Sequence, residues 1–302
     1  MRHALIAVGV AVTAVLTVDI AVVALHDKAT PYDATQAVAD FRRQASATPG
    51  PSQATSTASA ARTAAPTGSA APSPTALPQQ SAAAVPSGAP ATARPANAAG
   101  KREVTEGVYR YTTSGHEQVD LLGGARHDYP AETAVTYRRG GCGDEDRWQP
   151  LKERYSSNTV CRGAHGLEAR ISIQRREFFN QSEEQVLTCA PGLVIVPDDP
   201  RAGQVFSGTC RSDDTVVRLV VRVREVTTMT VGGRRIGVVH VSVDGQMTGA
   251  TRGSTQREEW FTPEGLLVRG TSTTETDRDT SAGVVHYSEV YELRLNSLDP
   301  QR

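Results

Sequence analysis

Four cysteines, Cys142, Cys161, Cys189 and Cys210, are the residues of this chain best suited to a defined chemistry. In an exported chain an even number of cysteines favours disulfide bonds, and four cysteines allow three pairings. We predict Cys142–Cys161 and Cys189–Cys210, because each pair then brackets one strand–loop–strand unit and closes a loop of about twenty residues. The alternative is a zinc site of four thiolates, but such sites normally use C-x(2–4)-C pairs, which this sequence lacks.

Other residue types capable of chemistry do not form a catalytic pattern. The seven histidines include no H-E-x-x-H or H-x-H pair, and neither G-x-S-x-G nor a phosphate-binding glycine loop occurs. The acids Asp144, Glu145 and Asp146 are adjacent but lack the ligand set of a calcium loop, so we predict a solvated loop there. The sequence therefore predicts a protein that is not an enzyme, with no catalytic residue, metal or cofactor.

Aromatic residues near the cysteines have two interpretations. We expect Trp148 to pack in the core. The pair Phe178-Phe179, flanked by Arg175-Arg176 and Asn180, is either an exposed binding edge or one buried ring with a second ring covering it. The sequence does not separate these alternatives.

The region that positions these residues is dominated by β-strand patterns. In Thr215–Val226 apolar and arginine residues alternate, which indicates a half-buried strand. The same period continues in Arg235–Met247, Gln256–Phe261, Leu266–Thr274 and Val284–Leu295. A turn is expected at residues 262–265, where Pro263 presets φ and Gly265 can adopt positive φ. On the last strand we place Val285, Tyr287, Tyr291, Leu293 and Leu295 on one face.

The folded domain is expected to span residues 103–302. Its first part predicts a hairpin of Val108–Thr113 and Glu117–Leu122 across Ser114-Gly115, then a strand over Glu132–Arg138. Residues 101–302 contain 26 basic and 29 acidic side chains, a mixed surface of net charge −3 that does not favour nucleic acid. We predict an all-β, mainly antiparallel fold, built as a curved meander sheet or as a half-barrel or β-sandwich.

The chain begins with an apolar stretch, Ala4–Leu25, which as a helix would span roughly 33 Å, enough for a bilayer core. Arg2 precedes it while Asp27 and Lys28 follow, so we expect the N-terminus in the cytoplasm. The alternative is a signal peptide cleaved near residues 22–24, but the apolar stretch exceeds the usual 7–15 residues of such peptides. Residues 1–29 are therefore predicted to be a retained single-pass anchor in the cell membrane.

Two segments are expected between the anchor and the domain. Residues 30–44 predict a short juxtamembrane helix, with Val38 and Phe41 on one face. Residues 45–102 are rich in Ala, Pro, Ser and Thr and include nine of the 17 prolines, so they cannot form a core. We predict a disordered linker that acts as a spacer and places the 103–302 domain outside the cytoplasm.

Three segments carry a resemblance to a known class: GVYRY at residues 107–111, REEWFTPEGLLVRG at 257–270 and VYELRLNSL at 290–298. They resemble the consecutive hairpins of half-barrel envelope proteins of the LolA and LppX type, which implies a curved antiparallel sheet whose concave face binds lipid. The anchor, spacer and cysteine-bearing β-domain, with 29 Arg against 3 Lys, also resemble uncharacterised actinobacterial exported proteins. Unlike the lipid carriers, the chain has no lipid-attachment cysteine and no amphipathic helix suited to cover a concave face.

These observations predict a membrane-anchored extracytoplasmic binding or scaffold module of the cell envelope. Its expected partners are the membrane, through the N-terminal helix, and a lipid or other hydrophobic ligand held on a curved sheet. The alternatives are a protein–protein interaction module without a ligand cavity and an envelope hydrolase. A concave apolar cavity would favour the lipid ligand, a filled core the interaction module, and a convergent His/Asp/Glu pocket the hydrolase.

Overall fold

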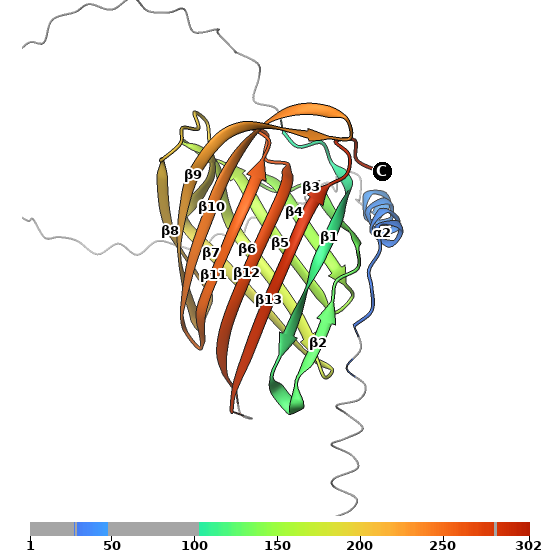
Figure 1. The fold of residues 1–302 in the computed structure, drawn as a ribbon, viewed down its shortest axis with the longest axis vertical. Helices are drawn as coiled ribbons and strands as arrows, with labels where there is room; N and C mark the ends of the chain where they lie inside the picture. Colours follow the sequence, from blue (N-terminus) through green and yellow to red (C-terminus); the bar gives the residue numbers. More distant parts are fainter. Residues whose placement is uncertain (1–26, 28, 48–102, 281–282) are drawn as a thin grey trace, which may run out of the picture. The chain divides into compact units, whose positions relative to one another are not determined.

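A computed structural model describes residues 27, 29–47, 103–280 and 283–302 of the chain (Figure 1). The described residues form one 13-stranded antiparallel sheet, one α-helix and one short 3-10 helix. The predicted all-β, mainly antiparallel fold is thus confirmed.

The strands follow one another along the chain with short connections. They are β1 (Gly107–Val119), β2 (Ala125–Asp128), β3 (Glu132–Arg139), β4 (Gly143–Leu151), β5 (Arg154–Arg162), β6 (Gly166–Phe178), β7 (Gln181–Pro197), β8 (Val205–Arg211), β9 (Thr215–Val231), β10 (Arg234–Gly249), β11 (Thr251–Phe261), β12 (Leu267–Thr280) and β13 (Gly283–Leu295). The helix is α2 (Ala34–Ala47), and the 3-10 helix η1 (Leu121–Gly123) joins β1 to β2.

Alternation of apolar and polar side chains explains the strands of the C-terminal half. In β9, Val217, Val221 and Val223 are buried while Arg222 and Arg224 are exposed, as the sequence predicts. The turn expected between β11 and β12 is also present: the Gly265 amide donates to the Thr262 carbonyl at 2.9 Å, and Gly265 has a φ of +105°. The strands predicted over the last ninety residues are therefore confirmed.

The two ends of the sheet are joined. From β3 to β13 each strand pairs with the next, β1 pairs with both β2 and β3, and β1 also pairs with β13 from Tyr111↔Leu295 to Val119↔Tyr287. Figure 1 shows β1 lying beside β13. The strands thus form one meander sheet, as the first of the predicted alternatives has it, and the β1–β13 pairing closes this sheet into a ring. Because there is a single sheet, the β-sandwich alternative is wrong, and the closure was not part of the half-barrel prediction.

The predicted hairpin at Ser114-Gly115 is wrong, because β1 runs straight through these residues. Gly115 has a φ of +138°, and a Cβ on it would lie 2.1 Å from the carbonyl oxygen of Val290 on β13. The glycine therefore permits a close approach of two strands and not a chain reversal.

Apolar side chains fill much of the ring interior. One cluster includes Tyr111, Trp148 and Leu293, and a second includes Val221 and Val241, all at most 4% exposed. Trp148 is a core residue, as expected.

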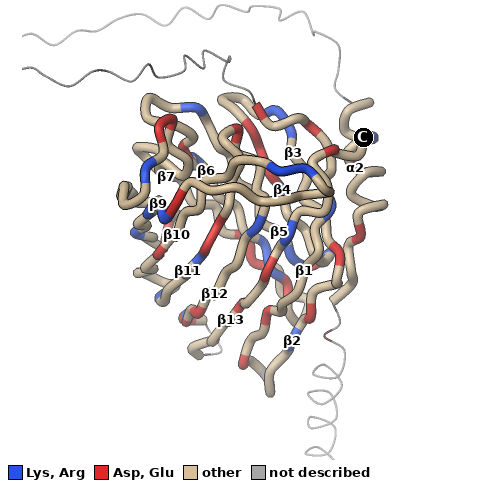
Figure 2. The backbone as a smooth tube through the Cα atoms, turned by 45° about the horizontal axis from the view of Figure 1, so that its top comes forward, with Lys and Arg blue, Asp and Glu red and all other residues tan. Residues whose placement is uncertain are grey.

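The helix predicted over residues 30–44 is present as α2, and it packs on the sheet instead of standing apart from it. Ala34, Ala37 and Val38 are buried against Val108 of β1 and Ala134 of β3. Figure 2 shows α2 beside these strands. The segments that flank residues 48–102 therefore belong to the same body, and residues 48–102 themselves, most of the predicted linker, lie outside the described residues.

In the described part of the chain no helix is long and apolar enough to cross a membrane. The predicted anchor segment, Ala4–Leu25, lies outside the described residues.

Candidate functional site

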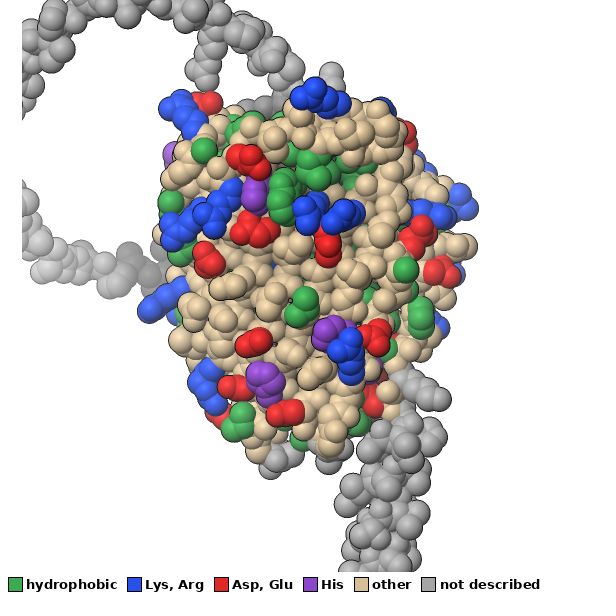
Figure 3. Space-filling model, in the orientation of Figure 1, with side chains coloured by type: hydrophobic (Ala, Val, Ile, Leu, Met, Phe, Trp, Pro, Cys, Tyr) green, Lys and Arg blue, Asp and Glu red, His purple; other side chains and the backbone are tan. Residues whose placement is uncertain are grey.

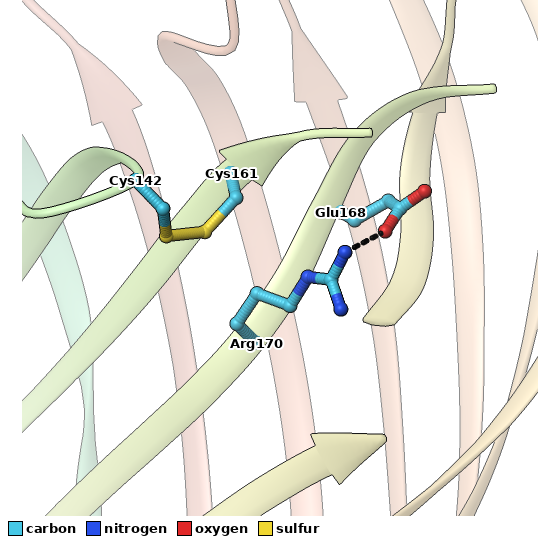
Figure 4. Close-up of a disulfide and its surroundings, with 4 residues drawn as sticks. All are labelled: Cys142, Cys161, Glu168 and Arg170. Atoms are coloured by element: carbon cyan, nitrogen blue, oxygen red, sulfur yellow. Dashed lines mark hydrogen bonds and ion pairs between the residues drawn. A yellow bond between two sulfur atoms is a disulfide. The ribbon is translucent and has the colours of Figure 1, made fainter. Parts of the chain in front are cut away.

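The four cysteines form the two predicted disulfides, Cys142–Cys161 and Cys189–Cys210, so the zinc alternative is wrong. The first joins the segment before β4 to β5, next to a hydrogen bond of 2.7 Å from Arg170 to Glu168 on β6 (Figure 4). The second joins directly opposite residues of β7 and β8, whose ladder contains only two residue pairs. The Cys189–Cys210 bond therefore links the two neighbouring strands of the ring that share the fewest backbone pairs.

A cluster of charged side chains lies buried inside the ring. Glu117 of β1 and Glu289 of β13 are direct cross-strand partners, with side chains 0% and 4% exposed. Arg154 of β5 reaches across the interior, placing Nε 3.1 Å from Glu289 Oε1 and 3.6 Å from Glu117 Oε2. Two buried carboxylates side by side repel each other, and this guanidinium offsets that repulsion.

Two tyrosines complete the hydrogen bonding of these carboxylates. Tyr129 donates to Glu289 Oε1 at 2.5 Å, and Tyr287 donates to Glu117 Oε2 at 3.0 Å. Burial, with the neighbouring carboxylates adding to it, raises the pKa of both hydroxyls well above the ordinary value. Both tyrosines are therefore neutral donors at physiological pH.

His127 of β2 links this cluster to the N-terminal segment. Its Nδ1 lies 3.2 Å from Glu117 Oε1 and its Nε2 lies 3.4 Å from Asp27 Oδ2. Burial alone lowers the pKa of His127, but the hydrogen bond with Glu117 and the charges of Glu117 and Asp27 outweigh it and raise the pKa. The imidazole also stacks on Phe178 at 4.3 Å; Phe178 and Phe179 are both largely buried, so the exposed binding edge is wrong.

The predicted acidic loop is instead part of β4. Asp146 faces inward and accepts a hydrogen bond of 2.9 Å from Asn158 on β5. Burial, together with the charges of Glu259 and Glu145, raises its pKa to about 7. This carboxyl therefore titrates in the physiological range.

The inner cluster is built as a structural network. Its carboxylates are paired and sealed from solvent, and access by a substrate would require the ring to open. Within the described residues no group of three or more His, Cys, Asp or Glu side chains is arranged to hold a metal ion.

A second group of functional residue types lies on the outer surface of β9 to β13. We call it the outer belt, and it consists of Arg224, Glu225, His240, Glu258, Trp260, Arg269, Glu292 and Arg294. Figure 3 shows basic, acidic and histidine side chains gathered in a row across this face.

Cross-strand contacts hold the belt in place. Trp260 stands between its two strand partners: the His240 ring stacks on it at 4.0 Å, and the Arg269 guanidinium lies 4.7 Å from its centroid. His240 Nε2 is 2.7 Å from Glu258 Oε2, and Arg269 donates to Glu292 at 3.0 Å. A polar cleft of about 360 Å³ beside the belt is lined by residues that include Gln256, Thr271 and Thr273.

Sequence reasoning missed most of these residues. Glu289 lies on the same strand face as Tyr287 and Tyr291. A charged residue among the apolar positions of a strand was therefore the sequence signal that could have indicated a buried carboxylate. For Arg154 there was no such signal, because its partners are 37 residues earlier and 135 residues later in the chain.

Comparisons of the chain with models of protein families, with curated proteins and with solved structures found no match.

Proposed function

We propose that this chain is a membrane-anchored, non-catalytic interaction module that works outside the cytoplasm and recognises an envelope protein through the outer belt. Ala4–Leu25 would be the anchor. The two disulfides support an oxidising compartment, where such bonds persist.

The observation that carries this proposal is the contrast between the two faces of the sheet. Inward side chains such as Glu117, Arg154 and Glu289 are buried and already paired with one another. An acyl chain placed among them would separate these charges without replacing their partners, which is strongly unfavourable. We therefore place recognition on the outer face and not on a lipid inside the ring.

The outer belt has the properties of a binding surface. Tryptophan and arginine dominate the energetics of many protein interfaces, and Trp260 and Arg269 lie in contact at its centre. Because neighbouring strands already hold these side chains, a partner would immobilise few additional rotamers. The interspersed acids and bases favour a protein partner whose surface carries complementary charges.

Photo-crosslinking in intact cells tests the proposal. A photoreactive residue is placed at Thr273, an exposed position of β12 beside the belt, and as a matched control at Thr188, an exposed threonine of β7. The proposal expects one discrete protein adduct at Thr273, weakened by Arg269→Ala in a chain of unchanged melting temperature. Equal adducts at both positions, or none at Thr273, would contradict it.

A further inference from the structure

Asp27 fastens the start of the described chain to one end of the ring. Its Oδ1 accepts a hydrogen bond of 3.0 Å from the amide of Phe179, at the turn between β6 and β7. Its Oδ2 lies 3.4 Å from His127, and the Asp27 side chain is only 11% exposed. We call this the clasp end; it contains β2, the β6–β7 turn, the last residues of β12 and the first residues of β13, which lie together at the lower end of the sheet in Figure 1.

The chain remains bound to the same body after Asp27. The Thr30 amide donates to Glu153 at 2.8 Å, the Lys152 amide donates to the Thr30 carbonyl at 2.9 Å, and the Tyr32 amide donates to the Pro150 carbonyl at 3.1 Å. Helix α2 then packs on β1 and β3. Contacts at Asp27, Thr30, Tyr32 and α2 therefore fix the N-terminal segment to the ring.

We propose that the clasp end rests against the surface of the bilayer, with the strands rising from it. This inference rests on the proposed anchoring through Ala4–Leu25. Only His26 lies between Leu25 and Asp27 in the sequence, and the two chain steps from Leu25 to Asp27 span at most about 7 Å. The anchor therefore brings the clasp end to the membrane, and the 48–102 segment adds no distance between them. The exposed Val284 at the start of β13 lies at this same end.

The orientation restricts the partner. The outer belt then faces sideways from the ring, parallel to the bilayer, so a protein bound to it would lie beside the ring, close to the same membrane. A long flexible tether would have allowed partners far from the membrane.

Fluorescence quenching in liposomes of phosphatidylethanolamine and phosphatidylglycerol, with a small share of nitroxide-headgroup lipid, tests this orientation on the full chain. The native cysteines are disulfide-bonded, so a fluorophore attaches only to an added cysteine. Arg126→Cys labels the clasp end and Arg201→Cys the opposite end; both arginines are exposed and ion-paired to an aspartate two residues away. The β6–β7 hairpin between the two ends is about 40 Å long.

We expect several-fold stronger quenching at position 126 than at position 201. Asp27→Ala should reduce that difference, Asp27→Asn, which keeps an acceptor for the Phe179 amide, should reduce it less, and Asp213→Ala, at an exposed aspartate, should leave it unchanged. Equal quenching in a chain that resists alkaline extraction would overturn the orientation alone. Release of the chain by alkaline carbonate would overturn the anchor and this inference with it.

Discussion

At the scale of single residues, Arg154 is the cation that forms ion pairs with both buried carboxylates of the inner cluster. Its side chain is 2% exposed, and it lies between two carboxylates that the β1–β13 register brings opposite each other. Replacing a buried pair with apolar groups is often tolerated, but removing one partner leaves an uncompensated charge.

Arg154→Met should therefore lower the free energy of unfolding by about 3–5 kcal/mol, because Glu117 and Glu289 lose their shared partner. Urea unfolding followed by circular dichroism measures the change. The matched control is Arg110→Met, whose partner Glu132 is half exposed, and it should cost less than about 1 kcal/mol. If the two variants lose equal stability, the inner network is not what holds this part of the ring together.

Stability should fall as pH rises from 6 to 8. Folding raises the pKa of Asp146 from 3.8 to about 7 and also raises that of His127, so the folded state binds protons more tightly than the unfolded chain. The contribution of Asp146 to the free energy of unfolding is complete below its unfolded pKa and is lost as pH rises through about 7. The contribution of His127 is complete below its unfolded pKa of about 6.5 and is lost as pH rises through its raised pKa in the folded state.

Urea midpoints at pH 6 and pH 8 measure this dependence. Asp146→Asn should flatten the profile and stabilise the protein at pH 8, since the neutral amide removes the need to ionise a buried carboxyl. A wild-type midpoint that rises with pH would refute the assignment.

At the scale of elements, the ring has one weak seam, between β7 and β8, where only Thr188↔Arg211 and Cys189↔Cys210 are paired. The Cys189–Cys210 bond carries the connection there. The Cys142–Cys161 bond instead joins β5 to the residue just before β4, and these two strands are already well paired.

Replacing either cysteine pair with alanine should cost roughly 3 kcal/mol by the loop-entropy estimate, so each variant should still fold. The two variants should differ in hydrogen exchange: amides of β8 should exchange much faster without Cys189–Cys210 and change little without Cys142–Cys161. Equal exchange of β8 in both variants would mean that the seam is held by other contacts. Non-reducing peptide mapping checks the pairing itself.

Strand patterns were the most predictable elements. Strands β9 to β13 follow from alternation, because one side of each faces an apolar interior. Strand β1 was predicted wrongly because a glycine that allows close strand contact has the same local sequence signal as a glycine in a turn. The disulfides were predictable because both bonds join neighbours along the meander.

At the scale of the whole molecule, ring closure was not predictable from the sequence. It pairs residues such as Glu117 and Glu289, which are 172 positions apart, and alternation within a strand carries no information about so distant a partner. Asp27 and α2 also contact residues that are far away in the sequence, namely Phe179 for Asp27 and Val108 and Ala134 for α2. Their packing on the sheet was therefore not predictable from local sequence patterns either.

The central claim is that this ring is held outside the cytoplasm by its N-terminal segment. The most direct measurement is protease added to intact spheroplasts that carry the full chain with a C-terminal tag, with a cytoplasmic protein as the control for leakage. We predict that the tag is removed while the control survives, and that the chain recovered from untreated cells has no free thiol. A tag that stays protected until the membrane is broken, or four free thiols in the recovered chain, would contradict the account.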